Sequence, residues 1–152
     1  MLERFKNLIS DLMGEKSDTN MFNENDHRLA AAALLIHAIA VDGFIDDEER
    51  EKVSEILQRH FELNENETAE LIVEATEKDN EAVDLYSFTS IIKRAFDQEG
   101  RLNMVEMLWE IVYVDGIVHE FEDNLVWRVS ELLGVSTRDR MHLKSKVREA
   151  QQ

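Results

Sequence analysis

Two stretches of this chain decide its fold, because they are two copies of one pattern. RLAAAALLIHAIAVDGFIDDEE, residues 28–49, aligns without gaps with RLNMVEMLWEIVYVDGIVHEFE, residues 101–122. In both copies an apolar run ends in Val-Asp-Gly, an aliphatic residue stands two positions after the glycine, and a glutamate stands six positions after it. Such an internal repeat predicts a helical domain with approximate two-fold symmetry.

Each copy contains only the second half of an EF-hand calcium loop. The glycine, the aliphatic residue and the glutamate match positions six, eight and twelve of that loop. Positions one and three, which should carry oxygen ligands, are Ala38 and Ala40 in the first copy and Ile111 and Tyr113 in the second. Because both copies lack the same half, the pattern is a separate motif and not a decayed calcium loop.

Helical periodicity extends through nearly the whole chain of 152 residues, which contains no proline and five glycines. We therefore expect an all-α protein: a compact helical bundle of about seven to eight helices with an internal pseudo-two-fold repeat. Residues 1–25 read as an amphipathic N-terminal helix followed by a polar linker, and residues 26–152 as the helical domain. The expected helices cover residues 2–13, 26–40, 46–61, 64–77, 84–96, 101–114, 120–134 and 136–150.

The composition restricts the possible partners. Lysine and arginine total 17 against 33 aspartates and glutamates, so the formal net charge is −16. A surface this acidic repels phosphate backbones, which argues against nucleic acid and favours cations or a basic protein partner. The chain has no cysteine and no apolar run of transmembrane length, and we expect a cytoplasmic protein.

The N-terminal amphipathic helix has two possible roles that the sequence leaves open. It can pack on its own domain, or it can dock onto a partner. Glu3 and Asp11 nearly offset Arg4 and Lys6, so the helix lacks the basic face that anionic lipids select. This charge balance argues against membrane association.

The acidic residues of the two corners have two interpretations. In the structural one, both glycines end helices, and Asp46 with Glu49 forms a capping box at the start of the next helix. The second copy tests that interpretation, because His119 is a poor N-cap and yet Glu122 is present. Capping thus explains Glu49 better than Glu122, whereas a shared role as cation ligands explains both.

The two Asp-Gly units in register, each behind an apolar helix, resemble the tellurite-resistance TerB-like family of small all-helical bacterial proteins. The similarity runs from about residue 29 to residue 146. The resemblance implies a compact helical bundle, a link to stress and tellurite resistance, and divalent metal binding by paired acidic positions. In this sequence those positions are Asp42, Glu49, Asp115 and Glu122, with His119 and Asp46 as further candidates.

The candidate ligands define a class of ion. Carboxylates without sulfur favour Ca²⁺, Mg²⁺ or Mn²⁺, and the two corners must lie near one another to form a joint site. No nucleophile elbow, phosphate loop or zinc signature occurs, so we expect a non-enzymatic protein. The alternative to a cation-binding module is a protein–protein interaction module in which the acidic corners are purely structural.

Two groups of residues carry further expectations. His37 and Glu110 occupy equivalent positions of the repeat on apolar helices, and each should need a hydrogen-bonding partner in the core. Trp109, Tyr113 and Trp127 fall within apolar runs at helical spacing, which predicts that they pack in the core.

Overall fold

A computed structural model of the protein describes residues 22–23, 26–40, 46–82, 84–115 and 118–151. Within these residues every regular element is a helix, which confirms the expected all-α bundle. The helix expected at residues 2–13 lies outside the described residues. The elements are α2 (His27–Ile39), α3 (Asp47–Phe61), α4 (Glu65–Glu81), α5 (Tyr86–Ala95), α6 (Gln98–Val112), the 3-10 helix η2 (Tyr113–Asp115), α7 (Glu120–Leu133) and α8 (Thr137–Ala150).

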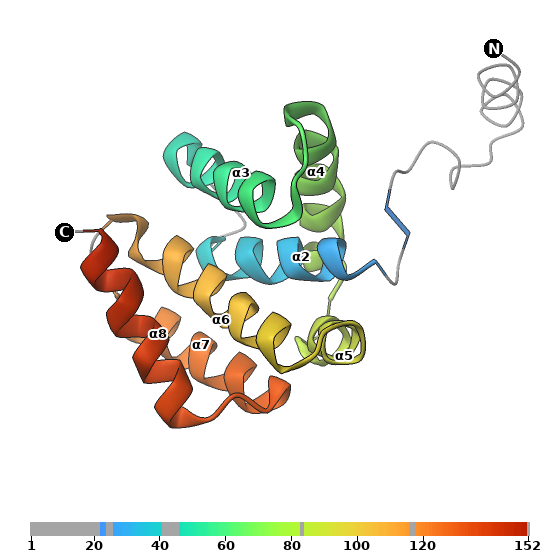
Figure 1. Ribbon diagram of the computed structural model, residues 1–152. Coiled ribbons are helices and arrows are strands. Elements are labelled where there is room, and N and C mark those ends of the chain that lie inside the picture. The colour runs from blue at the N-terminus through green and yellow to red at the C-terminus, as the bar shows by residue number, and fades with distance from the viewer. Residues whose placement is uncertain (1–21, 24–25, 41–45, 83, 116–117, 152) are drawn as a thin grey trace, which may run out of the picture.

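Helix α2 runs through the centre of the bundle (Figure 1). It begins at Asp26, whose side chain accepts a hydrogen bond from the backbone N–H of Arg28 at 2.8 Å. Nearly all of its residues are buried, and the four successive alanines from Ala30 to Ala33 let neighbouring helices approach closely. Contacts with α3, α4, α5 and α6 surround it, as an apolar helix without a polar face requires.

Helix α6 is the second apolar helix, and it packs against α2. The two most apolar helices are thus in contact, but α2 packs more extensively on α4 than on α6. On its other side α6 contacts α8. The indole of Trp109 is fully buried there, and its Nε1–H donates to the carbonyl oxygen of Arg140 at 3.1 Å. The indole therefore fills the core and satisfies a backbone group of α8.

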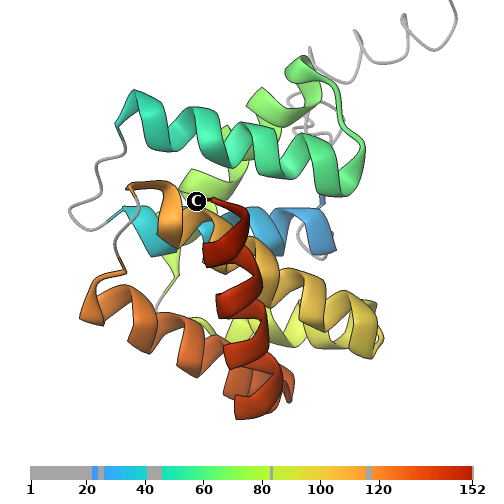
Figure 2. The same ribbon diagram turned by 60° about the vertical axis from the view of Figure 1, so that its left-hand side comes forward.

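Helices α3 and α7 follow the two apolar helices. They begin at Asp47 and Glu120, which keeps the 73-residue offset of the sequence repeat. Both start at the same side of the molecule (Figure 2). Helix α7 ends at Leu133 and is followed by Gly134, whose φ of 77° makes it a left-handed C-cap. The first residues of α3 and α7 that the structure describes therefore lie on one side of the bundle.

In the described part of the chain, no helix is both long and apolar enough to cross a membrane. The longest, α4, has 17 residues and carries many charged side chains.

Candidate cation-binding corners

The first corner leads into α3. Asp42 lies in residues 41–45, outside the described residues. Asp46 is the N-cap of α3, and its side chain accepts from the N–H of Glu49 at 2.8 Å. In return, the N–H of Asp46 donates to Glu49 Oε1 at 3.4 Å. This reciprocal pair confirms the predicted capping box.

The second corner leads into α7. The backbone of Asp115 ends η2, and its side chain lies outside the described part of the structure. The N–H of His119 donates to Glu122 Oε1 at 3.0 Å. The expectation that capping does not explain Glu122 is therefore wrong. The reason is that this half of a capping box uses the backbone N–H of the N-cap residue, so the identity of the side chain at position 119 does not affect it.

The two capping glutamates, Glu49 and Glu122, interact electrostatically. Burial raises the pKa of Glu49, and the negative charges of Asp46 and Glu122 raise it further, against the lowering effect of the hydrogen bond from the Asp46 backbone. Glu49 and Glu122 thus lie near enough for their charges to repel. Each accepts its capping hydrogen bond at Oε1.

The structure brings together only part of the predicted ligand set. Glu49 and Glu122 share a neighbourhood with Asp46, while the side chains of Asp42 and Asp115 are not among those described. No group of three or more metal-ligating side chains occurs among the described residues. Metal binding by the full set of Asp42, Glu49, Asp115 and Glu122 therefore stays a prediction.

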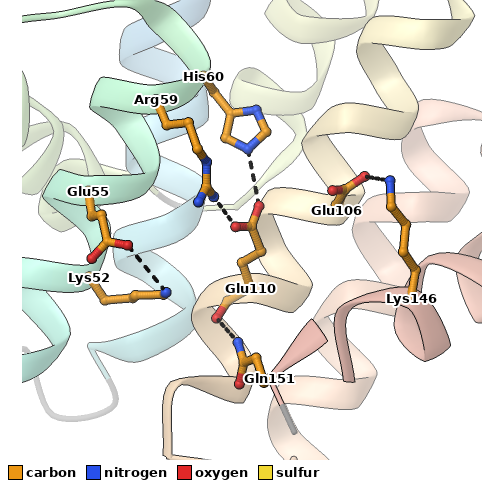
Figure 3. Close-up of polar contacts among 8 residues, drawn as sticks. All are labelled: Lys52, Glu55, Arg59, His60, Glu106, Glu110, Lys146 and Gln151. Atoms are coloured by element: carbon orange, nitrogen blue, oxygen red, sulfur yellow. Dashed lines mark hydrogen bonds and ion pairs between the residues drawn. The ribbon is translucent and has the colours of Figure 1, made fainter. Parts of the chain in front are cut away.

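Both polar residues of the central helices have the partners they were expected to need. His37 Nδ1 lies 2.8 Å from Asp79 Oδ1 on α4. Glu110 binds two side chains of α3, with Arg59 at Oε1 and His60 Nε2 3.1 Å from Oε2 (Figure 3). The need for a partner was visible in the sequence, but the partners lie 42 to 51 residues away and could not be named from it.

The charge of Glu110 is held in place by its partners. Burial alone would raise the pKa of this carboxyl group, whose side chain is 13% exposed. The hydrogen bond from His60 and the positive charge of Arg59 outweigh burial and hold its pKa below the ordinary value. The carboxylate therefore joins α6 to α3 as an ion and is not free to act as a metal ligand.

The aromatic residues follow the prediction only in part. Trp109 and Tyr113 are buried, and their rings lie 6.2 Å apart between centroids. Trp127 is 45% exposed, so the expectation that it packs in the core is wrong. The neighbouring Val126 and Val129 occupy the buried face of α7, which turns the intervening tryptophan toward solvent.

The geometry defines a class of protein: an acidic all-helical domain, built on two apolar helices, whose corners carry capping glutamates. Residues 28–145 match the family model described as tellurite resistance protein TerB, and the chain belongs to that family. Searches among curated proteins and among solved structures found no match to this chain.

Proposed function

We propose that this TerB-family domain is a non-enzymatic cytoplasmic module that binds a divalent cation at its two corners and acts in the response to stress or tellurite. The single observation that supports it most is that Glu49 and Glu122 lie near enough to interact: burial is the main cause that raises the pKa of Glu49, and the negative charges of Asp46 and Glu122 add to it. A cation between two such carboxylates relieves the repulsion. Asp42 and Asp115, next to the same corners in the sequence, would supply the remaining oxygen ligands.

The ligand chemistry selects the ion. Four carboxylates suit Ca²⁺, Mg²⁺ or Mn²⁺ better than softer ions. Two separate corners cannot surround an ion as a continuous calcium loop does, so water keeps part of the coordination sphere. We expect a dissociation constant on the order of 10⁻⁴ to 10⁻³ M, as in weak calcium modules.

A paramagnetic titration tests the proposal. Mn²⁺ added to the ¹⁵N-labelled protein should broaden the amide signals of the two helix starts first, and Mg²⁺ should compete. Asp115→Asn with Glu122→Gln should abolish the broadening, and glutamine can keep the capping bond of Glu122. The matched control, Asp47→Asn with Glu48→Gln, removes two exposed charges from the same side of the molecule without touching the candidate ligands. Equal broadening in both double variants would show only diffuse attraction to an acidic surface.

A second candidate function rests on a different observation. Both glutamates are already used in capping, as the structural interpretation requires. A groove of about 510 Å³ beside α3 and the start of α4 is lined by Glu51, Glu55 and Glu65, together with Ser54, Gln58, Leu63 and one cation, Arg59. Under this alternative the domain binds a basic protein partner through its acidic surface. The same titration separates the two, because this alternative expects no saturable cation binding at the corners.

A further inference from the structure

A second polar site lies away from the corners, in a small cavity between four helices. It has a volume of about 140 Å³ and is reached from the ends of α2 and α4, the start of α5 and the side of α7. The residues that line it are His37, Asp79, Ala82, Asp84, Leu85 and Arg128. Its charged side chains come from three different elements, so the fold, and not one local turn, assembles the cavity.

The imidazole of His37 is fixed in orientation. Its Nδ1 lies 2.8 Å from Oδ1 of Asp79, whose side chain is only 9% exposed. An ionised carboxylate can only accept, so Nδ1 donates this hydrogen bond and Nε2 of the neutral ring is an acceptor. The ring itself is 39% exposed. At the equivalent position of the repeat, Glu110 is covered by its partners Arg59 and His60. A polar residue at this position can therefore have a structural role without an open cavity beside it, such as the one beside His37.

The cavity also holds two opposite charges that do not neutralise each other. Asp84 uses Oδ1 to accept from the backbone N–H of Tyr86 at 2.9 Å, which leaves its second oxygen available. Arg128 is exposed on α7 and lines the same cavity. Among the described residues no ion pair joins Arg128 to Asp84 or to Asp79. A guanidinium and a carboxylate held apart across one cavity can be bridged by a ligand that carries both charges.

We propose that this cavity binds a small zwitterion, a free α-amino acid of about the size of alanine. Its carboxylate binds the guanidinium of Arg128, and its ammonium donates to Asp84 and to Nε2 of His37. The short side chain contacts Ala82 and Leu85.

Charge and size exclude the neighbouring ligand classes. With Asp79 committed to His37, the lining presents one positive and one negative side chain, which suits a neutral dipolar ligand better than a dianion or a free divalent ion. The volume is well below the roughly 300 Å³ of the smallest drug-sized pockets, which limits the ligand to a few non-hydrogen atoms.

The test is a titration of the ¹⁵N-labelled full chain with L-alanine. We expect saturable shifts confined to residues 79–87, the amide of Arg128 and the His37 ring. Propionate, which lacks the ammonium, and ethylammonium, which lacks the carboxylate, should each bind at least about tenfold more weakly, because a charged hydrogen-bonding partner is missing.

Two charge-removing variants should keep the fold and lose the ligand. Arg128→Gln changes an exposed side chain, and Asp84→Asn keeps an oxygen that can accept from Tyr86. Each should weaken alanine binding by about tenfold or more, whereas Arg138→Gln on the exposed face of α8 should leave it unchanged. The proposal is overturned by absence of saturable binding at millimolar alanine, by equal binding of propionate, or by full binding in either variant.

Discussion

Glu110 shows how one carboxylate can join two layers of this bundle. It sits on the apolar helix α6, and its two oxygens bind Arg59 and His60 of α3 (Figure 3). Glu106, one turn earlier, instead pairs with Lys146 of α8 at 3.1 Å. The two cations are similarly exposed, Arg59 at 52% and Lys146 at 59%, but Glu110 also binds His60, which is only 20% exposed, so solvent screens the interactions of Glu110 less than the single pair of Glu106.

Glu110→Gln should therefore destabilise the protein at neutral pH, by about 1.5–3 kcal/mol, because it leaves the mostly buried His60 and the half-exposed Arg59 without their anion. The folded-state pKa of Glu110 lies below its ordinary value of 4.5. Its contribution is thus complete above that value and is lost as the pH falls through the folded pKa. The free energy of unfolding, measured with urea, should be lower for Glu110→Gln than for the unmodified protein at neutral pH, and this difference should be smaller at about pH 3. Glu106→Gln should cost less than about 1 kcal/mol, and a similar cost for both variants would contradict the argument.

The junction between helices α5 and α6 depends on one small residue. Gly100 lies in the first turn of α6, where its N–H donates to the capping side chain of Asp97 at 3.0 Å. A Cβ at Gly100 would meet Cβ of Phe96 at 2.7 Å, and Phe96 also packs on the ring of His27 with 5.0 Å between the two ring centroids. The near end of the phenylalanine cannot move without the backbone, so glycine is what lets the two helices meet this closely.

Gly100→Ala should accordingly destabilise the protein by about 1–3 kcal/mol, although alanine is the better helix former. Thermal unfolding followed by circular dichroism measures the effect. Glu99→Ala, at the neighbouring exposed position, serves as the control and should be nearly neutral. Adding Phe96→Gly, which removes the Cβ atom that the new methyl group would meet, should remove most of the extra cost of the Gly100 change. An unchanged or raised melting temperature for Gly100→Ala would contradict the packing argument.

Sequence reasoning worked well for the elements and less well for the site. Periodicity and caps predicted α2 to α8 because the helical spacing of apolar residues and an N-cap such as Asp46 are local signals. It was wrong about Glu122, because the hydrogen bond that this carboxylate accepts comes from the backbone N–H of residue 119 and does not depend on which side chain stands there. It also did not find the cavity beside His37, because Asp79 and Arg128 approach only after four helices have packed. Such distant pairings leave no pattern in one sequence.

At the scale of the whole molecule, charge dominates. A net charge of −16 means that the folded state is destabilised by self-repulsion, which any salt will partly screen. The helix starts add a local version of the same effect, since the negative charges of Asp46 and Glu122 add to burial in raising the pKa of Glu49. A stabilising effect of cations is therefore expected in general, and only a comparison at equal ionic strength can reveal a specific ion at the corners.

The final prediction makes that comparison. At matched ionic strength, about 10 mM MgCl₂ or CaCl₂ should raise the melting temperature above that in NaCl by about 3–6 °C, as expected for a ligand at roughly ten times its dissociation constant. Asp115→Asn with Glu122→Gln should lose this difference but still respond to NaCl, while the Asp47→Asn, Glu48→Gln control should keep it. Suppose instead that the Asp115→Asn, Glu122→Gln variant melts at a higher temperature than the unmodified protein, and that divalent ions raise neither melting temperature above its value in NaCl. The four carboxylates would then be a repulsive surface whose glutamates serve only to cap α3 and α7.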